Sequence, residues 1–417
     1  MWKVVKSKFF WVCMVIICAF VGLLSIAQVG ARNSAKVKEM PVAIVNESHS
    51  KVSKKLVKSL KDKFSDSDAT LKIIDVNKES KLKQGFADKK YYGALVIDKD
   101  FDDTLTTQQN YLKGLIMQAK LAKLPAQQKT SPQVKAQLAE AKKLVAQKPA
   151  QAKIRVLISQ GSNMQASSLL STALPQIGEG LGQGLAKQMQ ATLDKNKVTL
   201  SSAQWQTINQ PIKVTTKVKN KIPDKSISGM APMIFVMLAW ISSFMPSMFL
   251  RKSHHELDED SKIGLKTVNN QMGSGILLTV IATLAIFVIV HLMFGVPIKN
   301  TGSFLLTLAL TVAVLYLLQT CLLNWFGMGG QPILMVIWLL SMAVATYPKE
   351  MLSPIFRNGV YSWTPVRFAM DLFTNNLYIS GSSATTQTDI IVLVSIGLVA
   401  LFAVYMSGLF KKSAAKK

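Results

Sequence analysis

The sequence predicts a polytopic α-helical membrane protein with six transmembrane helices and an extracellular α/β domain inserted between helices 1 and 2. Hydrophobic residues make up 49% of the 417 positions, and they gather in uncharged runs of about 20 residues, the length that crosses a bilayer. One run lies near the N-terminus and five lie in the second half. Between them, strand-like and helix-like segments alternate, which is typical of an α/β fold.

The candidate spans share an absence of Asp, Glu, Lys and Arg from their interiors. They are residues 9–29, 230–250, 275–294, 304–326, 332–347 and 390–410. The first has a rival interpretation as a cleaved signal peptide. Its apolar run exceeds the usual 7–15 residues of a signal sequence, so we expect it to be retained as an anchor.

The basic residues near helix ends predict the orientation, because Lys and Arg in short loops favour the cytoplasmic side. With the N-terminus inside, the short inner segments carry eleven basic residues and the short outer segments carry four. We therefore expect a multi-pass cell-membrane protein with both termini cytoplasmic. The predicted parts are residues 1–30, with helix 1; residues 31–228, extracellular; and residues 229–417, a five-helix membrane domain.

The extracellular part is expected to contain five strands and several helices. Apolar, β-rich runs predict strands at residues 41–45, 71–76, 93–97, 154–159 and 211–218. Helical spacing of apolar residues predicts helices at 52–64, 80–90 and 164–194, the last loosened by four glycines. Residues 103–150, rich in Gln, Ala, Lys and Leu, predict a helical hairpin or helical insert.

No constellation of catalytic or metal-binding residues is evident. The three cysteines lie inside apolar runs, which excludes a disulfide-stapled domain and a four-cysteine metal site. The extracellular part has one histidine, His49, and no cysteine, so we expect neither a metal nor a catalytic residue there. A membrane-bound enzyme is therefore disfavoured.

The formal net charge of +26 reflects an excess of lysine. Membrane spans weigh against nucleic acid as the partner. The excess fits an anionic surrounding, such as a cell-wall polymer or lipid head groups, and simple solubility explains it equally well. The lysine-rich composition also favours a Gram-positive bacterium as the source.

The chain carries no evident energy source of its own. Ion-driven carriers usually keep ionisable residues at mid-membrane, but the span interiors offer only His291, near an outer end where we expect an interfacial role. No phosphate-binding GxxxxGK[ST] loop occurs. If the protein moves a cargo, another polypeptide must supply the energy.

The loop at 251–270 is the most charged cytoplasmic segment and the best candidate to receive motion from an ATPase. Its candidate coupling residues are Arg251, Lys252, His254, Glu256, Leu257, Asp258, Glu259 and Asp260. An ordinary solvated loop is the alternative. On the outer side, Pro348, Pro354 and Pro365 interrupt an amphipathic segment, about 348–387, that also contains Arg367. We expect short helices there that dip into the outer leaflet.

Several short motifs resemble the YhgE/Pip branch of type-2 ABC exporter permeases. They are the strand at 41–47, the run YYGALVIDKDF at 91–101, Met230-Ala231-Pro232, and Tyr347-Pro348 with Pro365 and Arg367. The resemblance implies a dimer of six-helix halves, identical or different, with separate ATPase subunits that hold ATP and Mg. It implies no cofactor in this chain. The compact outer part differs from the far longer helical ones of many relatives.

A second function stays open from the sequence. A cell-surface scaffold or receptor, in phage infection or in secretion assembly, needs no transport and no ATPase. The apolar spans leave the cargo of an exporter open among lipids, lipid-linked polymers, hydrophobic drugs and antimicrobial peptides.

Overall fold

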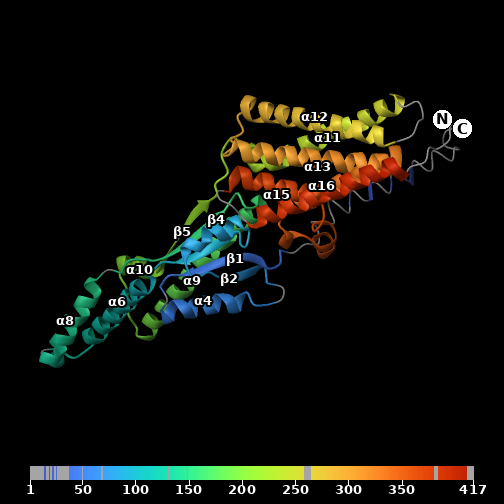
Figure 1. Cartoon of the computed structure of the whole chain (residues 1–417). Helices are drawn as coiled ribbons and strands as arrows, with labels where there is room; N and C mark the ends of the chain where they lie inside the picture. The colour runs from blue at the N-terminus through green and yellow to red at the C-terminus, as the bar shows by residue number, and fades with distance from the viewer. Residues whose placement is uncertain are drawn as a thin grey trace, which may run out of the picture.

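The computed structural model describes residues 37–257, 264–379 and 384–410, apart from 49, 67, 68, 130 and 148, together with residues 14, 15, 18, 21, 22 and 25. The predicted first span therefore lies almost wholly outside the described residues. The described parts form an elongated molecule with a sheet in the middle, a bundle of apolar helices at one end and a helical hairpin at the other (Figure 1).

In the part of the chain that the structure describes, five strands form one mixed sheet with the order β2-β1-β3-β4-β5. They are β1 (Met40–Asn46), β2 (Leu71–Asp75), β3 (Gly93–Ile97), β4 (Ala152–Ser159) and β5 (Ile212–Lys219). The β3–β4 pair is antiparallel and the other pairs are parallel. Each strand lies within two residues of its predicted position. The central strands β1 and β3 are buried on both faces, as their continuous apolar runs predict.

Alternating side chains of the strands enter two separate cores. Val42 and Ile44 belong to one core, and Ala43 and Val45 to the other. The first is covered by α4 (Lys51–Lys63), α9 (Met164–Lys195) and the start of α6 (Phe101–Ala122). The second is covered by η2 (Glu79–Lys81) and α5 (Leu82–Ala87). The helices predicted at 52–64, 80–90 and 164–194 are confirmed by these elements.

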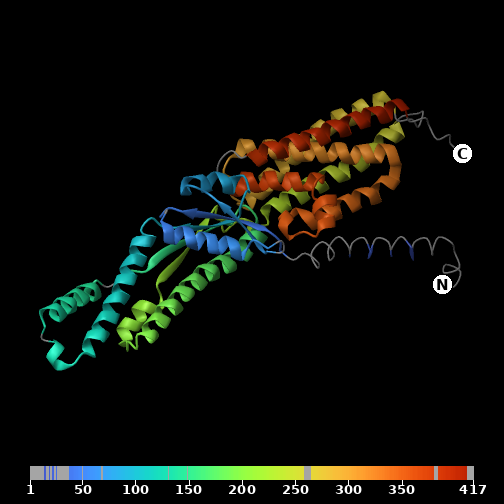
Figure 2. The same cartoon turned by 90° about the horizontal axis from the view of Figure 1, so that it is seen from below.

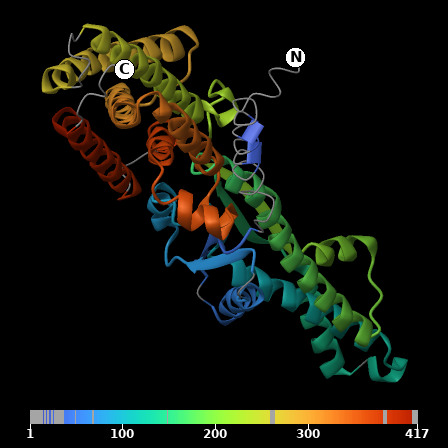
Figure 3. The same cartoon turned by 90° about the vertical axis from the view of Figure 1, so that its right-hand side faces the viewer.

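The expectation that glycines loosen α9 is wrong, because the helix is continuous from Met164 to Lys195. Two of the four glycines allow a close approach to β5: a Cβ built on Gly178 would lie 2.8 Å from Val214 Cγ2, and one on Gly182 would lie 3.3 Å from Ile212 Cβ. Gly180 and Gly184 face open space. Figure 3 shows α9, the long green helix, running from the bundle toward the far tip.

The predicted helical hairpin is present and projects away from the sheet (Figure 2). It consists of α6, α7 (Ala126–Lys129) and α8 (Pro132–Ala146). A Cβ on Gly114 of α6 would lie 2.9 Å from Leu144 Cβ of α8, so the two helices pack closely. The middle of α6 also packs against α9 and α10 (Ser202–Asn209), where Tyr111 and Leu115 are buried.

Among the described residues, the bundle is built from six helices of the second half of the chain. They are α11 (Ala231–Leu257), α12 (Leu265–Phe287) with its π-helical extension η4 (Val288–Met293), α13 (Thr301–Phe326), α14 (Gly330–Ala345), α15 (Pro365–Tyr378) and α16 (Ala384–Phe410). Within the described residues, four segments are long and apolar enough to cross a membrane, and the third of these comprises both α13 and α14.

A tight turn separates α13 from α14, so the two helices are distinct passes of the chain. The turn, η5 (Gly327–Gly329), begins with φ of +61° at Gly327, a conformation that favours glycine. The returning helix then runs back along α11. Gln331 Nε2 lies 3.3 Å from Met248 Sδ, and the rings of Trp338 and Trp240 are 4.9 Å apart.

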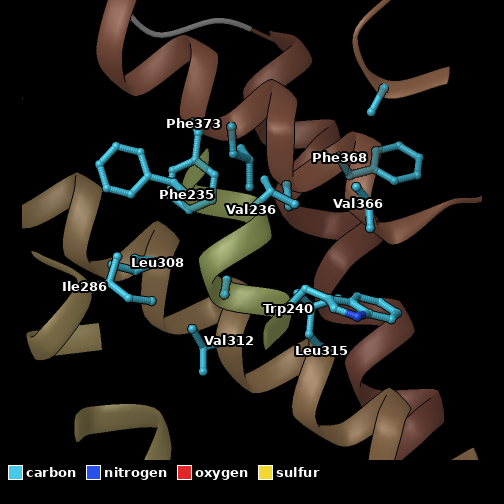
Figure 4. Close-up of a cluster of buried hydrophobic side chains, with 14 of the residues drawn as sticks. Phe235, Val236, Trp240, Ile286, Leu308, Val312, Leu315, Val366, Phe368 and Phe373 are labelled. Carbon is cyan, nitrogen blue, oxygen red and sulfur yellow. The ribbon is translucent and has the colours of Figure 1, made fainter. Parts of the chain in front are cut away.

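Aromatic side chains form the centre of the bundle. The ring centroids of Phe235 (α11), Phe304 (α13) and Phe373 (α15) lie 4.7–5.6 Å from one another. Figure 4 shows Phe235 and Phe373 side by side in this cluster. The main helix of the outer proline-rich segment is part of this core, and the expected position of the segment in the outer leaflet stays a prediction. Helix α15 buries its apolar face, including Val366 and Leu372, against α11, α13, α14 and α16.

Candidate functional site

The sheet meets the bundle at the end where β4 and β5 finish. Asn163, the N-cap of α9, donates from Nδ2 to the carbonyl oxygen of Thr346 at 3.4 Å. The backbone N–H of Lys38 donates to the carbonyl oxygen of Glu350 at 3.2 Å. These contacts join the sheet to the segment that follows α14. This junction is the place where movement of the bundle would reach the sheet.

The two-residue turn after α5, formed by Asp88 and Lys89, makes hydrogen bonds to the start of α16 and to the middle of α15. Asp88 accepts a hydrogen bond from the backbone N–H of Ala384 at 3.1 Å, and its carbonyl oxygen accepts one from Thr385 Oγ1 at 3.0 Å. The next residue, Lys89, donates from Nζ to Asp371 Oδ1 at 2.6 Å. Lys89 has φ of +53°, a conformation that costs energy for a residue with a Cβ.

Lys89, Arg367, Asp371 and Asp389 form a charge cluster, and Arg367 lies at its centre. Its Nε is 3.4 Å from Asp371 Oδ2, and its Nη2 is 3.9 Å from Asp389, which is only 1% exposed. The guanidinium group lies 4.2 Å from the ring centroids of both Tyr361 and Phe368. Two cations thus face two carboxylates in a largely desolvated place, where the removal of one partner is costly because it leaves the other unpaired.

The predicted outer residues therefore have two kinds of role. Pro348 is the N-cap of η6 (Lys349–Met351), and Pro354 precedes η7 (Phe356–Val360) by two residues. Pro365 is the first residue of α15, where proline is well tolerated. These prolines begin short helices, whereas Arg367 belongs to the charge cluster.

A cavity of about 350 Å³ lies beside this cluster, between the start of α9, the start of α11, the end of α14 and α15. Five methionines contribute to its wall: Met164, Met230, Met233, Met342 and Met370. Asp371 also lines it, so the charge cluster and the cavity share a residue. Methionine side chains are flexible and polarizable, and surfaces rich in them adapt to apolar ligands of different shape.

The candidate coupling residues lie at the opposite end of the bundle. Helix α11 continues to Leu257 and α12 begins at Leu265, so the connection is much shorter than the predicted loop at 251–270. Arg251 and Lys252 lie in the last turns of α11, which also contains the backbone of His254, Glu256 and Leu257. Asp258, Glu259 and Asp260 lie outside the described residues.

The Arg251 side chain, near the end of α11, lies close to the turn between α13 and α14. A Cβ built on Gly327 would lie 3.5 Å from Arg251 Nη2. The reason for the longer helix is that residues 251–257 contain no glycine or proline, so nothing in this segment interrupts the helical hydrogen bonds of the second span. This arrangement brings α11, α13 and α14 together next to the α11–α12 connection.

A buried amide pair lies in the same half of the bundle. Asn324 Nδ2 donates to Gln271 Oε1 at 2.9 Å, and Gln271 Nε2 donates to Asn324 Oδ1 at 3.3 Å. Tyr316 Oη donates to the carbonyl oxygen of Gln271 at 2.9 Å. These bonds join α12 to α13 in an apolar surrounding, where each group needs its partner. They were missed because uncharged amides leave a span apolar by composition.

Other residues of the site were also missed by sequence reasoning. The spacing of Arg367 and Asp371, four residues apart on one helix, is a signal for an ion pair. Asp389 lies just before the predicted last span, 390–410, but α16 begins five residues earlier than Asp389, at Ala384. No sequence signal connects Lys89 to Asp371. His291, predicted to be interfacial, has Nδ1 2.6 Å from the carbonyl oxygen of Val296, at the end of η4.

Among the described residues, no group of three or more His, Cys, Asp or Glu side chains is placed to hold a metal ion. The arrangement offers mechanical contacts, an apolar cavity and a charge cluster, rather than a nucleophile with its base.

A family model described as "ABC-2 family transporter protein" matches residues 8–406. No curated protein and no solved structure matches the chain.

Proposed function

The chain belongs to the ABC-2 family of transporter proteins, and on this premise we propose that it is the membrane subunit of an exporter powered by a separate ATPase subunit coupled to the α11–α12 connection. Membership supports a permease subunit in a multi-pass membrane protein that works with an ABC ATPase and with membrane lipids. The coupling site, the orientation and the branch of the family are the finer parts of the proposal.

One observation supports the assignment of an outer end and a cytoplasmic end to the bundle. The sheet contacts the bundle where α11 begins and α14 ends, through Asn163 and Thr346. The α11–α12 connection lies at the other end of α11. A transporter driven from one side of the membrane and open to the other needs these two parts on opposite sides.

The basic residues support the sidedness. With the α11–α12 connection inside, the short inner segments carry eleven basic residues and the short outer ones four, which is the bias of cytoplasmic loops. The sheet and its hairpin then face the exterior. The lysine excess of this region suits anionic surroundings outside the cell. The resemblance to the YhgE/Pip branch, with a dimer of two such subunits, is part of this proposal.

The test is isolation of the tagged full chain in mild detergent, with mass spectrometry of bound proteins and an ATPase assay. We expect one nucleotide-binding subunit per copy. Reversing the charge of Glu256, Asp258, Glu259 and Asp260 together is expected to abolish stimulated ATP hydrolysis. The matched control reverses Glu140 on the projecting hairpin, which lies at the far end of the molecule.

The alternative, a surface scaffold or receptor without transport, is favoured by the projecting hairpin. The deletion that tests it has to spare α6, because Tyr111 and Leu115 are buried against α9 and α10. Gln108 Nε2 also donates to the carbonyl oxygens of Ala150 and Pro211, each at 2.8 Å. Replacing residues 123–147 by a short Gly/Ser linker removes α7 and α8. Loss of partner binding with no ATPase recovered would favour the scaffold.

A further inference from the structure

A second hollow, distinct from the methionine-lined cavity, lies on the sheet's α4–α9 face. This groove, of about 850 Å³, runs between α4, the start of β2 and the first half of α9. Apolar residues that line it include Leu60, Phe64, Leu71, Leu169 and Ile177. Ligand sites typically enclose about 300–1,000 Å³ and are mostly apolar with few polar groups. The groove therefore has the size and lining of a ligand site.

The groove begins next to the bundle. Val37 lines it, and the next residue, Lys38, donates its backbone N–H to Glu350 after α14. The predicted first span, residues 9–29, ends only a few residues before Val37.

The charge at the groove points to the chemistry of the ligand. Lys63 lies in its wall, and the helix that carries Lys63 contains six lysines and one aspartate. No acidic residue is among the described residues that line the groove. A cationic rim beside an apolar wall complements an anionic head group attached to an apolar chain.

One face of α9 connects the groove to the methionine-lined cavity. Gln165 lines the cavity, and Leu169, Ala173, Gln176 and Gly180 line the groove. These residues follow one another at intervals of three or four, which places them along one side of a helix. The cavity and the groove therefore lie one after the other along the same face of α9.

We propose that the groove binds an acyl chain of an anionic membrane lipid, that the Lys63 ammonium pairs with its head group, and that such lipids are the substrate class of the exporter. This inference rests on the proposed export function. The lipid reaches the groove from the bundle by way of the methionine-lined cavity, along α9.

The direct test uses the purified full chain in nanodiscs that contain phosphatidylglycerol with a photoactivatable acyl chain. Cross-linked residues are mapped by mass spectrometry. We expect labelling of the α9 residues Leu169, Ala173 and Ile177. Labels only on the lipid-facing helices of the bundle, or none on α9, would overturn the proposal.

Gly180 and Gly184 offer a matched pair of variants. Both lie on α9 with nothing within 4 Å of a built Cβ, so leucine fits at either place without disturbing the fold. Only Gly180 lines the groove. Gly180→Leu fills it and is expected to lower α9 labelling at least fivefold, whereas Gly184→Leu leaves labelling unchanged. Equal labelling in the two variants contradicts the proposal.

The head group is tested with Lys63→Gln and with Lys58→Gln as its control, since Lys58 is exposed on the same helix and does not line the groove. Lys63→Gln is expected to lower labelling by phosphatidylglycerol at least threefold and to leave that by phosphatidylcholine unchanged. The same loss in both variants would show only a general attraction to a basic surface and would overturn the specific pairing.

Two other possible occupants of the groove would each give a different pattern of cross-links. Cross-links from groove residues to residues 31–36 of the same chain, or to a second copy, would overturn the lipid assignment. The ATPase co-purification separates the two proposals. Absence of lipid from the groove with an ATPase bound removes only this inference, whereas absence of the ATPase removes the exporter on which it rests.

Discussion

Lys89 and Asp371 are separated by 282 residues along the chain, yet Lys89 Nζ donates to Asp371 Oδ1 at 2.6 Å. The side chains are 11% and 19% exposed, so both charges are largely removed from water. Because Asp371 also faces Arg367 and lines the methionine-rich cavity, this pair connects the sheet to the helix that borders the cavity.

Replacing Lys89 by Gln is expected to destabilise the protein by about 1–3 kcal/mol, the cost of removing one hydrogen bond to a largely buried charged group. Thermal unfolding in detergent measures the loss. Lys90→Gln is the control, because the Lys90 side chain is 68% exposed. A double-mutant cycle with Asp371→Asn isolates the pair, and a coupling energy near zero would show that the contact does not join the two parts.

The buried amide pair of Gln271 and Asn324 gives a prediction about the end of the bundle that lies away from the sheet. Gln271→Leu and Asn324→Leu are each expected to cost about 1–2 kcal/mol, since each leaves the other amide unpaired. The double replacement should cost less than the sum of the two. Asn270→Leu, on the exposed side of α12, is expected to change little. Strict additivity in unfolding measurements would argue against the pair.

Glu350 predicts a dependence of stability on pH. Burial raises the pKa of its carboxyl group, although Lys349 and Arg357 oppose this effect. Because the folded state holds this proton more firmly than the unfolded state, the group destabilises the fold above its folded pKa, and this effect fades as pH falls. Glu350→Gln is expected to raise Tm at pH 7.5 by about 1 °C, the shift that about 1 kcal/mol produces in a chain of this length.

The control for Glu350 is Glu140→Gln on the exposed side of the hairpin, which we expect to leave Tm unchanged. The advantage of Glu350→Gln over the wild type should shrink at acidic pH. An advantage that stays constant with pH would mean that desolvation of the carboxylate is not its cause.

The ion pair of Arg155 and Glu79 predicts a pH dependence of stability that is opposite in sign to that of Glu350. Its Nη1 and Nη2 donate to the two carboxylate oxygens of Glu79 at 2.8 Å, and its Nε donates to Asp98 at 2.6 Å. The hydrogen bonds from Arg155 lower the pKa of Glu79, so the pair stabilises the fold above the unfolded-state pKa of Glu79, and this contribution is lost as pH falls through the folded one.

Arg155→Lys keeps the charge but loses the two-point contact. The pair is partly exposed, so we expect a cost of about 1 kcal/mol at neutral pH that disappears in acid. Lys153→Arg on the same strand is the control. A cost that persists below the folded pKa of Glu79 would assign the effect to packing rather than to the ion pair.

The strands and the apolar helices were predictable because each leaves a local pattern. The run at residues 93–97 is buried on both faces of the sheet, and it is apolar throughout. The roles of Gly178 and Gly182 were not predictable, since a glycine that admits a neighbouring strand looks the same in sequence as one that weakens a helix.

The candidate site was predictable only in part. Arg367 was singled out, but Asp389, which it faces, and Lys89, which pairs with Asp371, lie on other elements, and no local pattern places them together. The burial of α15 was missed for a related reason. An amphipathic helix presents the same spacing whether its apolar face meets lipid or Phe235 and Phe304.

The most direct test of the central claim is ATP hydrolysis by the complex isolated with the tagged chain from its native membrane and reconstituted in lipid. We expect a nucleotide-binding subunit at one copy per chain and activity that falls at least tenfold when Glu256, Asp258, Glu259 and Asp260 are reversed in charge, with the subunits still assembled. Recovery of the chain without any ATPase, or full activity in that variant, would contradict an exporter coupled through the α11–α12 connection.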